Sequence, residues 1–185
     1  MVKLNLGCGT KKLEGYINID KAASVHPDKV IDLELGHLPF KDNSVDEIYA
    51  EHTLEHIKNF HELVQEMLRV SKVGTIWNFD VPWHSSWGQA NDPTHVRCFT
   101  HHSFDYYYKA MCWSHEVNNI SGKQIWPLKR HINFSQGTGV LGIILRSLFN
   151  PIVNCHNRAQ DIYGRFFTYW FPASEINFKL KIIKC

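Results

Sequence analysis

The chain has 185 residues and a formal net charge of +2 at pH 7, with 44% hydrophobic and 13% aromatic residues. This length is enough for one domain, over residues 1–185, that buries a sizeable core. The basic residues form no block, so the composition gives no support to nucleic-acid binding. The five cysteines have no paired metal spacing, and the longest apolar run, Val140 to Leu145, is far shorter than the roughly 20 residues of a membrane span. Because no signal peptide is recognisable either, the sequence predicts a cytoplasmic protein without a transmembrane segment.

The first two expected strands end on residues that suit a nucleoside. A strand near residues 2–6 runs into Gly7 and Gly9, and a second strand near residues 16–19 ends on Asp20. Glycines allow the backbone to approach a ligand where a Cβ atom would clash. A carboxylate at the end of the neighbouring strand can accept both hydroxyls of a ribose. The pattern predicts a nucleoside pocket beyond the carboxyl ends of parallel strands.

The ligand of this pocket is predicted to carry no phosphate. A dinucleotide-binding loop has a third glycine three residues after the second, where this chain has Lys12. The link from Gly7 to Asp20 is too short for a crossover helix, so the helix N-terminus that binds a pyrophosphate is expected to be missing or reduced to a turn. S-adenosylmethionine (SAM), an adenosyl group joined to a sulfonium-bearing amino acid, fits these features.

The segments after the glycine bend follow in an order that is informative as a whole. They are a strand near 29–33, the segment LPFKDNS at 38–44, a strand near 45–50, the segment LEH at 54–56, and a helix over 58–72 that ends in EMLRV before a strand near 74–81. The helix has its apolar residues on one face. In this order the segments resemble the class I SAM-dependent methyltransferases, in particular the small type 11 group, over roughly residues 3–110.

This resemblance implies an α/β fold with a doubly wound, mostly parallel, Rossmann-like sheet and an antiparallel last strand. Strands near 113–120 and 176–184 are expected to close the sheet. SAM is the implied cofactor, with Asp32 accepting from the adenine amine and the backbone of Leu33 lining the ring. The whole implied cofactor set is Asn5, Gly7, Cys8, Gly9, Asp20, Asp32, Leu33, Glu51 and His52. Asn5 stands where relatives often have an acid, which leaves open the group that holds the cofactor's ammonium.

The loop over residues 82–99 is the expected acceptor site, because it follows a strand at the carboxyl end of the sheet. His95 or Asp92 could remove a proton from an acceptor hydroxyl or amine. The alternative is a surface loop in which the same two side chains cap a turn. Arg97 could hold an acidic substrate group or form a salt bridge. Trp83 and His84 are further expected substrate contacts, although the aromatic ring of Trp83 could instead belong to the core.

Two alternatives from other classes remain open. The segment His52-Thr53-Leu54-Glu55-His56 satisfies H-x-x-E-H, the inverted zinc-peptidase motif, in which two histidines on a helix bind zinc and the glutamate is the base. That motif needs a helix around both histidines and a third ligand, whereas a strand is expected to stop just before His52. We therefore expect no metal. The second alternative is a non-catalytic subunit with the SAM-binding fold that serves a partner.

The remaining residues are the least regular. A short helix is expected over 103–111, and residues 122–172 are expected to form a lid or substrate-covering insertion, with a packed helix from Val140 to Phe149. The predicted function is methyl transfer from SAM to an oxygen or nitrogen atom of a small molecule or glycan precursor. A lipid-linked acceptor is also considered, and the oligomeric state is left open.

Overall fold

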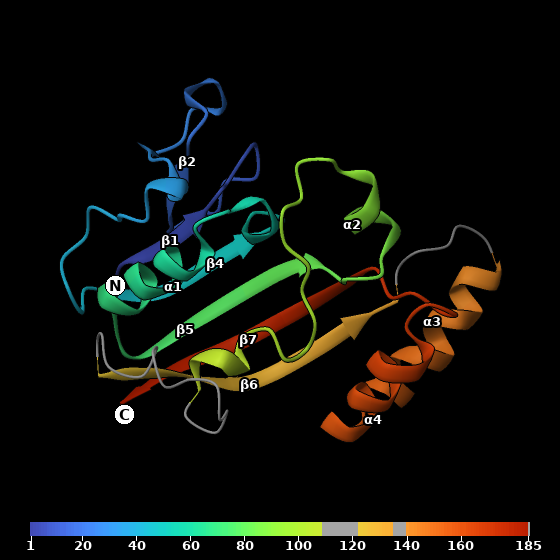
Figure 1. Cartoon of the computed structure of the whole chain (residues 1–185). Helices are drawn as coiled ribbons and strands as arrows, with labels where there is room; N and C mark the ends of the chain where they lie inside the picture. Colours follow the sequence, from blue (N-terminus) through green and yellow to red (C-terminus); the bar gives the residue numbers. More distant parts are fainter. Residues whose placement is uncertain (109–121, 135–139, 185) are drawn as a thin grey trace.

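A computed structural model describes residues 1–108, 122–134 and 140–184. Its centre is one sheet of seven strands in the order β3-β2-β1-β4-β5-β7-β6 (Figure 1). The strands are β1 (Lys3–Leu6), β2 (Ile17–Asp20), β3 (Lys29–Val30), β4 (Val45–Glu51), β5 (Ser71–Pro82), β6 (Lys123–Asn133) and β7 (Glu175–Lys184). The pairs from β3 to β5 are parallel, and β7 is antiparallel to both β5 and β6. The predicted fold class, with its antiparallel last strand, is confirmed.

The helices gather on one face of the sheet and at one end of it. They are α1 (Phe60–Val70), α2 (Trp87–Asn91), α3 (Val140–Val153) and α4 (Asn157–Ile162), with short 3-10 turns η1 (Ala23–Val25), η2 (Leu33–Leu35), η3 (Leu54–His56) and η4 (Asp105–Tyr107) and the π turn η5 (Tyr163–Phe167). Helix α1 lies across the face that Figure 1 shows, whereas α3 and α4 lie beyond the ends of β6 and β7. Among the described residues, no helix is long and apolar enough to cross a membrane.

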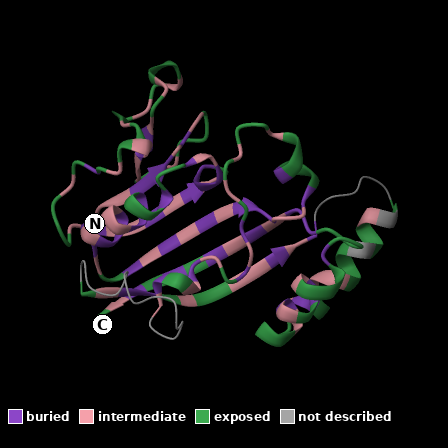
Figure 2. Cartoon of the chain, in the orientation of Figure 1, coloured by how far each residue is buried: buried purple, intermediate pink, exposed green. Residues whose placement is uncertain are grey.

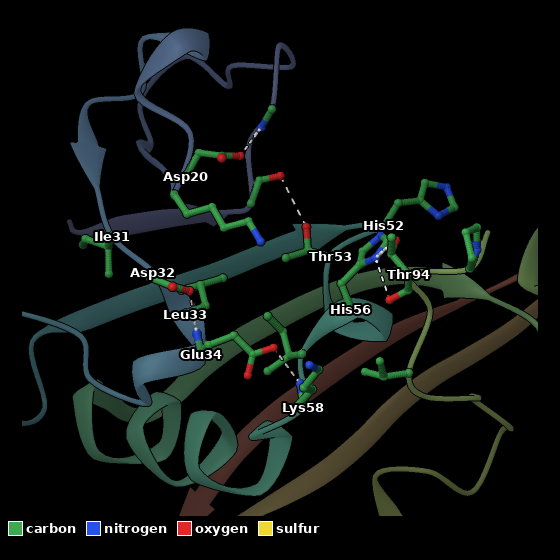
Figure 3. Close-up of a pocket in the computed structure, with 16 residues that line it drawn as sticks. Asp20, Ile31, Asp32, Leu33, Glu34, His52, Thr53, His56, Lys58 and Thr94 are labelled. Carbon is green, nitrogen blue, oxygen red and sulfur yellow. Dashed lines mark hydrogen bonds between the residues drawn. The ribbon is translucent and has the colours of Figure 1, made fainter.

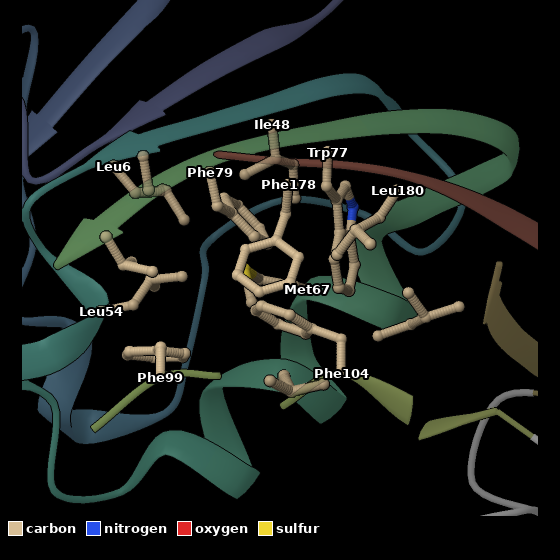
Figure 4. Close-up of a cluster of buried hydrophobic side chains, with 14 of the residues drawn as sticks. Leu6, Ile48, Leu54, Met67, Trp77, Phe79, Phe99, Phe104, Phe178 and Leu180 are labelled. Atoms are coloured by element: carbon tan, nitrogen blue, oxygen red, sulfur yellow. The ribbon is translucent and has the colours of Figure 1, made fainter. Parts of the chain in front are cut away.

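The hydrophobic core lies between α1 and one face of the sheet. The apolar face of α1, which includes Leu63, Val64 and Met67, is fully buried. It packs on strand residues that include Trp77 and Phe79 of β5 (Figure 4). Burial of each large apolar side chain between the helix and the sheet stabilises the fold by roughly 1.5–3 kcal/mol relative to its exposure to water. The loop before η4 completes the layer, since Phe104 contacts the rings of both Phe79 and Phe178.

The opposite face of the sheet is polar. Residues alternate between buried and partly exposed along β4, β5 and β7 (Figure 2). The partly exposed side chains form in-register rows, in which Tyr49 lies opposite Asn78 and Glu51 opposite Asp80. They also bond to one another, because the phenol of Tyr49 donates to Glu51 at 2.8 Å. Within the described residues no α-helix covers this face, since the links from β1 to β3 contain only turns and η1. The expected loss of the helix after the glycine bend is thus confirmed.

Some expected elements differ from the structure. The strand expected near 113–120 lies outside the described residues, and the edge strand that is described is β6, Lys123–Asn133. Residues 123–133 therefore belong to the sheet, not to an insertion over it. The helix expected over 103–111 is described only to residue 108, and there it is the single turn η4. Helix α3 is present, but it is not the packed helix expected, because Ile143 and Leu148 are more than half exposed.

Candidate functional site: two adjoining cavities at the carboxyl end of the sheet

The bend after β1 is bonded to the end of β2. The amide of Gly9 donates to Oδ2 of Asp20 at 2.8 Å, and the amide of Ala22 donates to Oδ1 at 2.8 Å. The amide of Cys8 donates to the carbonyl of Ile19 at 2.9 Å, which continues the pairing of the two strands. Each carboxylate oxygen has a second lone pair. Asp20 therefore holds the bend and can still accept hydrogen bonds from a ligand.

Gly7 and Gly9 are required for different reasons. Both have a positive φ, 64° and 49°. A Cβ atom on Gly7 would lie 2.2 Å from Oγ1 of Thr53, whose hydroxyl bonds to the carbonyls of Leu6 at 3.2 Å and Glu51 at 3.0 Å. A Cβ atom on Gly9 would meet no described atom within 4 Å. Gly7 therefore allows β1 and β4 to approach each other, whereas Gly9 borders open space.

That open space is part of a cavity of about 980 Å³ at the carboxyl ends of β1, β2 and β4. Its lining includes Gly7, Gly9, Asp20, Asp32, Leu33 and His52 from the sequence prediction (Figure 3). The carboxylates of Asp20 and Asp32 come from neighbouring loops at one side, and Thr94 comes from the loop after α2 at the other. Ligand pockets have volumes of roughly 300–1,000 Å³, so this cavity has room for an adenosyl group and an amino acid.

Glu34 fixes the wall of the large cavity where α1 begins. Its carboxylate accepts from the amides of Lys58 at 2.8 Å and Asn59 at 3.2 Å. Asn59 is the N-cap residue of α1 and its side chain makes no capping bond to the helix. The backbone amides that precede α1 are therefore hydrogen-bonded by a carboxylate from η2. A carboxylate at this position is favourable because the N-terminal end of a helix attracts negative charge.

We expect Glu34→Ala to lower the free energy of unfolding by about 1–2 kcal/mol, because the side chain acts as a capping group for two amides. Urea unfolding followed by circular dichroism measures the change. Glu14→Ala is the matched control, since Glu14 is an exposed glutamate and such substitutions usually stay within about 0.5 kcal/mol. Equal effects of the two substitutions would contradict the capping role of Glu34.

A second cavity of about 390 Å³ adjoins the first. Its lining includes Glu55, Asp92, His95 and Glu175, while His52 and His56 line both cavities. The loop with His95 is attached to η3, because the amide of Val96 donates to the carbonyl of Glu55 at 2.9 Å. The rings of His56 and His95 meet edge to face, 4.7 Å between centroids. The sequence-predicted pair His95 and Asp92 is thus brought together, with 3.7 Å between Nε2 and Oδ2.

His52 has a strained backbone where the two cavities meet. Its φ is 47°, which is uncommon for a residue with a Cβ atom. Its Nδ1 lies 3.5 Å from Glu55 and its Nε2 lies 3.5 Å from Glu175. The interaction with Glu175 has the larger effect and that with Glu55 the next, and together they raise the pKa of His52 to about 10. The imidazole is therefore a cation at neutral pH, placed at the edge of the cofactor cavity.

Three of the predicted cofactor residues lie outside the lining that the described residues give this cavity. The side-chain amide of Asn5 donates to Oδ1 of Asn18 at 2.9 Å and to the carbonyl of Lys11 at 3.0 Å. Asn5 therefore stabilises the bend through contacts with the protein. Glu51 pairs with Lys11 on the polar face of the sheet. The thiol of Cys8 is buried, and burial raises its pKa, which agrees with an inert role. The lining gives no support to direct cofactor binding by Asn5 or Glu51, which stays a prediction of the sequence.

The predicted substrate contacts also lie outside the two cavities as the described residues form them. Trp83 is fully buried and its indole N–H donates to Thr168 at 2.7 Å, so it is a core residue. His84 packs against Trp83, and burial lowers its pKa. The guanidinium of Arg97 stacks over Phe60, 4.6 Å from the ring centroid, and donates to the carbonyl of Lys58. All three belong to the loop expected to form the acceptor site, but their side chains contact the core or α1.

The zinc-peptidase alternative required one helix around both histidines of the motif. The structure has only the 3-10 turn η3 (Leu54–His56) there, and His52 precedes it with a left-handed backbone. His52 and His56 therefore do not stand one helical turn apart on a common face. The peptidase geometry is absent from the described residues.

Sequence reasoning missed several lining residues, and their signals differ. Glu34 follows the strand-end Asp32 by two residues, and Thr53 follows β4 by two, so both could have been found by extending the motifs. Lys58 and Val96 line the large cavity through loops far apart in sequence. Nothing in a single sequence shows that these two loops meet.

Comparisons with known proteins agree with this geometry. Residues 14–77, about a third of the chain, match a family described as a methyltransferase domain, of type 11. A search of curated proteins gave no match. The matched segment contains Asp20, Asp32 and the LEH segment, but it begins after the glycine bend.

Solved structures share the fold at low sequence identity. An O-methyltransferase of a trans-AT PKS multienzyme of Brevibacillus brevis, in complex with S-adenosyl-L-homocysteine, is 14% identical with a TM-score of 0.58, over 99% of this chain and 67% of that one. A SAM-dependent methyltransferase from Archaeoglobus fulgidus is 14% identical with a TM-score of 0.53, over 97% and 85%. The cyclase SpnF is 17% identical with a TM-score of 0.54, over 97% and 74%.

The presence of a cyclase among these structures means that the fold by itself does not fix the reaction. The matched methyltransferase segment supplies the additional information, because it contains the strand-end carboxylates that line the large cavity. Together with the strand order and the bond between Gly9 and Asp20, it makes the chain similar to methyltransferases in fold and, over residues 14–77, in sequence.

Proposed function

We propose that the chain binds SAM in the large cavity and transfers its methyl group to an oxygen or nitrogen atom of an acceptor bound in the adjoining cavity. The observation that carries this proposal is the bond of 2.8 Å between the Gly9 amide and Asp20 at the rim of an open cavity. It gives the bend and the strand-end carboxylate the relative position that an adenosyl group requires.

The residues present fit the cofactor. Asp20 would accept from the ribose hydroxyls, and Asp32 from the adenine amine beside Leu33. The space next to Gly9 is free of described atoms, as a close approach of the ligand requires. When bound, SAM supplies a methyl group already activated by the positive sulfonium. The cation of His52 stands at the edge of this cavity, where it could pair with the carboxylate of the methionine part.

The protein's main contribution would be to hold the two reactants together and to exclude water. His56 separates the two cavities, and the acceptor would lie next to His95 and Asp92. Nε2 of His95 is the proposed base for an acceptor that must lose a proton early. Its Nδ1 lies 3.3 Å from the carbonyl of Gln89, which can only accept, so the proton of a neutral ring stays on Nδ1 and Nε2 has a lone pair.

Calorimetric titration with S-adenosylhomocysteine tests the cofactor assignment. Binding with one site per chain is the expected result. An absence of binding would leave the alternative of a non-catalytic subunit, since a domain that only serves a partner need not bind the cofactor. A cytoplasmic location and a glycan acceptor stay predictions of the sequence.

An exposed apolar surface supports a lipid-linked acceptor, or an acceptor held at a membrane surface. We call it the α3 surface, and it consists of Val140, Ile143, Ile144, Leu148 and Ile152 on α3 together with Phe166, Phe167, Tyr169 and Trp170. It lies at the same end of the sheet as the acceptor cavity, since Thr168 accepts from Ser85 through its carbonyl at 2.9 Å. The charged residues between Val140 and Trp170 are Arg146, Arg158, Arg165 and Asp161, and the carboxylate of Asp161 is paired with His101 and His102. Apolar and basic groups on one surface favour anionic bilayers.

We expect the protein to sediment with vesicles that contain phosphatidylglycerol at low salt, and the variant Ile144→Asp/Leu148→Asp to stay mostly in the supernatant. The physical reason is that two apolar groups would be replaced by charges that anionic lipids repel. Val73→Asp is the matched control, since Val73 is 58% exposed at the other end of β5. If the native protein does not bind vesicles, or the control loses binding equally, the lipid-linked acceptor is the wrong class.

A further inference from the structure

The acceptor cavity contains a buried carboxylate without a hydrogen bond. The side chain of Glu55 is fully buried, and neither of its oxygens has a hydrogen-bond partner among the described residues. The ring nitrogens that approach it are Nδ1 of His52, in an ion pair at 3.5 Å, and Nε2 of His95 at 3.9 Å. Leaving a buried polar group without a partner costs roughly 1–3 kcal/mol, and more for a charged one. A buried carboxylate at the wall of a cavity can therefore gain stability by binding a cation there.

Two histidines stand beside this carboxylate. One ligand atom each of Glu55, His56 and His95 lie within 4.8 Å of one another. Donors around a single Zn²⁺ are about 3.3 Å apart, because each lies about 2.0–2.1 Å from the ion in a tetrahedron. Side-chain rotations that move these atoms by about 1 Å would therefore close the set around an ion.

Hydrogen bonds prepare both imidazoles to bind a cation. The hydroxyl of Thr94 donates to Oδ1 of Asp92 at 2.6 Å, so it must accept at 2.9 Å from Nδ1 of His56. In a neutral ring this leaves the lone pair of His56 on Nε2. His95 is fixed in the same way by the carbonyl of Gln89. A histidine ligand usually donates its other nitrogen to such a partner, which fixes the tautomer that binds the metal.

From these contacts we propose that Glu55, His56 and His95 bind one divalent cation with the ligand preference of Zn²⁺. Two imidazoles and one carboxylate form the three-ligand set of catalytic zinc sites, which leaves the fourth position open. All three residues line the acceptor cavity, and His56 lines the cofactor cavity as well, so an acceptor in that cavity could reach the open position. This use of the site differs from the peptidase motif, because Glu55 is a ligand and the third ligand comes from the loop after α2.

The role of the ion rests on the proposed methyl transfer, although its binding does not. An acceptor hydroxyl in the fourth position would lose its proton to water at neutral pH, because the cation stabilises the oxyanion. The oxygen's electron pair then forms the bond to the methyl carbon, while the carbon–sulfur bond breaks and its pair goes to sulfur. The products are a methyl ether and S-adenosylhomocysteine. His95 would then be a ligand and not the base, and these two roles exclude each other.

The described residues contain a second group of this kind, and it serves as the internal control. His101, His102 and Asp161 also lie within 4.8 Å of one another. Here, however, Oδ1 of Asp161 is bonded to both histidines, at 2.7 and 2.8 Å, and His102 is bonded to Asp105 as well. The carboxylate of this group already has its partners, so it has no comparable need for a cation.

The test is calorimetric titration of untagged, chelator-treated full-length protein with Zn²⁺, without SAM. We expect one Zn²⁺ per chain, and at least a 100-fold loss of affinity for Zn²⁺ in Glu55→Gln and in His95→Asn. Even the substitution of a residue that only hydrogen-bonds to a metal ligand lowers metal affinity 10–100-fold. His102→Gln should bind as the native protein does. Thermal melts show which variants are folded, and His56→Asn replaces either variant that is not.

Three outcomes would overturn the proposal: no stoichiometric Zn²⁺, unchanged affinity in the folded Glu55→Gln and His95→Asn variants, or a loss in His102→Gln. A parallel titration with S-adenosylhomocysteine separates this proposal from the proposed function. Cofactor binding without zinc rejects the ion and retains the methyltransferase assignment. Zinc without cofactor binding retains the ion and rejects its role in methyl transfer.

Discussion

Replacing Asp20 by alanine is expected to weaken the binding of S-adenosylhomocysteine at least tenfold, which is about 1.4 kcal/mol. The ribose hydroxyls would lose their acceptor in a partly buried site, and the amides of Gly9 and Ala22 would lose theirs. Both effects act in the same direction. Calorimetric titration measures the affinity, and a thermal melt shows how much of the change is a loss of folded protein.

The variant Asp20→Asn separates these two effects. An amide keeps one oxygen for the backbone, but its NH₂ group can only donate. We therefore expect this variant to retain most of the thermal stability and still to lose affinity. Asp46→Asn is a distant control, because Asp46 pairs with Lys72 and the amide of Val2 near the other end of β4. Full affinity in Asp20→Asn would contradict the assignment of Asp20 to the ribose.

The second large effect is expected for Gly7→Ala, which should lower the free energy of unfolding by about 2–5 kcal/mol. The left-handed backbone costs about 1–2 kcal/mol with a Cβ atom, and the overlap with Thr53 at 2.2 Å adds an overpacking cost of about 1–3 kcal/mol. Urea unfolding measures the total.

Gly9→Ala is the matched control, because its φ is also positive but its Cβ atom meets no described atom within 4 Å. It should cost only the backbone strain, about 1–2 kcal/mol, and reduce cofactor binding instead. The double variant Gly7→Ala/Thr53→Ala removes the two closest atoms, so the cost of Gly7→Ala should be smaller in that background. Equal destabilisation by the two glycine substitutions would show that Thr53 does not set the requirement at Gly7.

The sequence was sufficient for those parts of the fold that depend on local pattern. The strand-end carboxylates and the apolar face of α1 follow from periodicity and turn chemistry, and they appear where they were expected. The glycine bend joins Asp20 as predicted because β1 and β2 are neighbours in a parallel sheet, so a motif on one strand constrains the other.

The acceptor side was harder to predict because its residues meet through loops. His95 reaches Glu55 through a bond between Val96 and η3 that no pattern encodes. The sequence did not decide between a core and a substrate-binding role for Trp83, because a tryptophan after a strand can turn either way. In the structure its indole N–H donates to Thr168, 85 residues later in the chain. The exposure of α3 likewise depends on what lies next to it, not on its own apolar sequence.

The polar side of the sheet, on which the described part of the chain places no α-helix, also affects strand alignment. Sliding β4 by one residue against its neighbours would bury Glu47 and Glu51 and turn Ile48 and Ala50 toward water. The charged side chains contribute little to the core, but every alignment that is shifted by one residue would bury them at a high cost in free energy. The same alignment brings the end of β4, with Thr53 just beyond it, against the Gly7 bend. The polar side of the sheet therefore helps to set the geometry of the large cavity, although its side chains are not part of the lining that the described residues form.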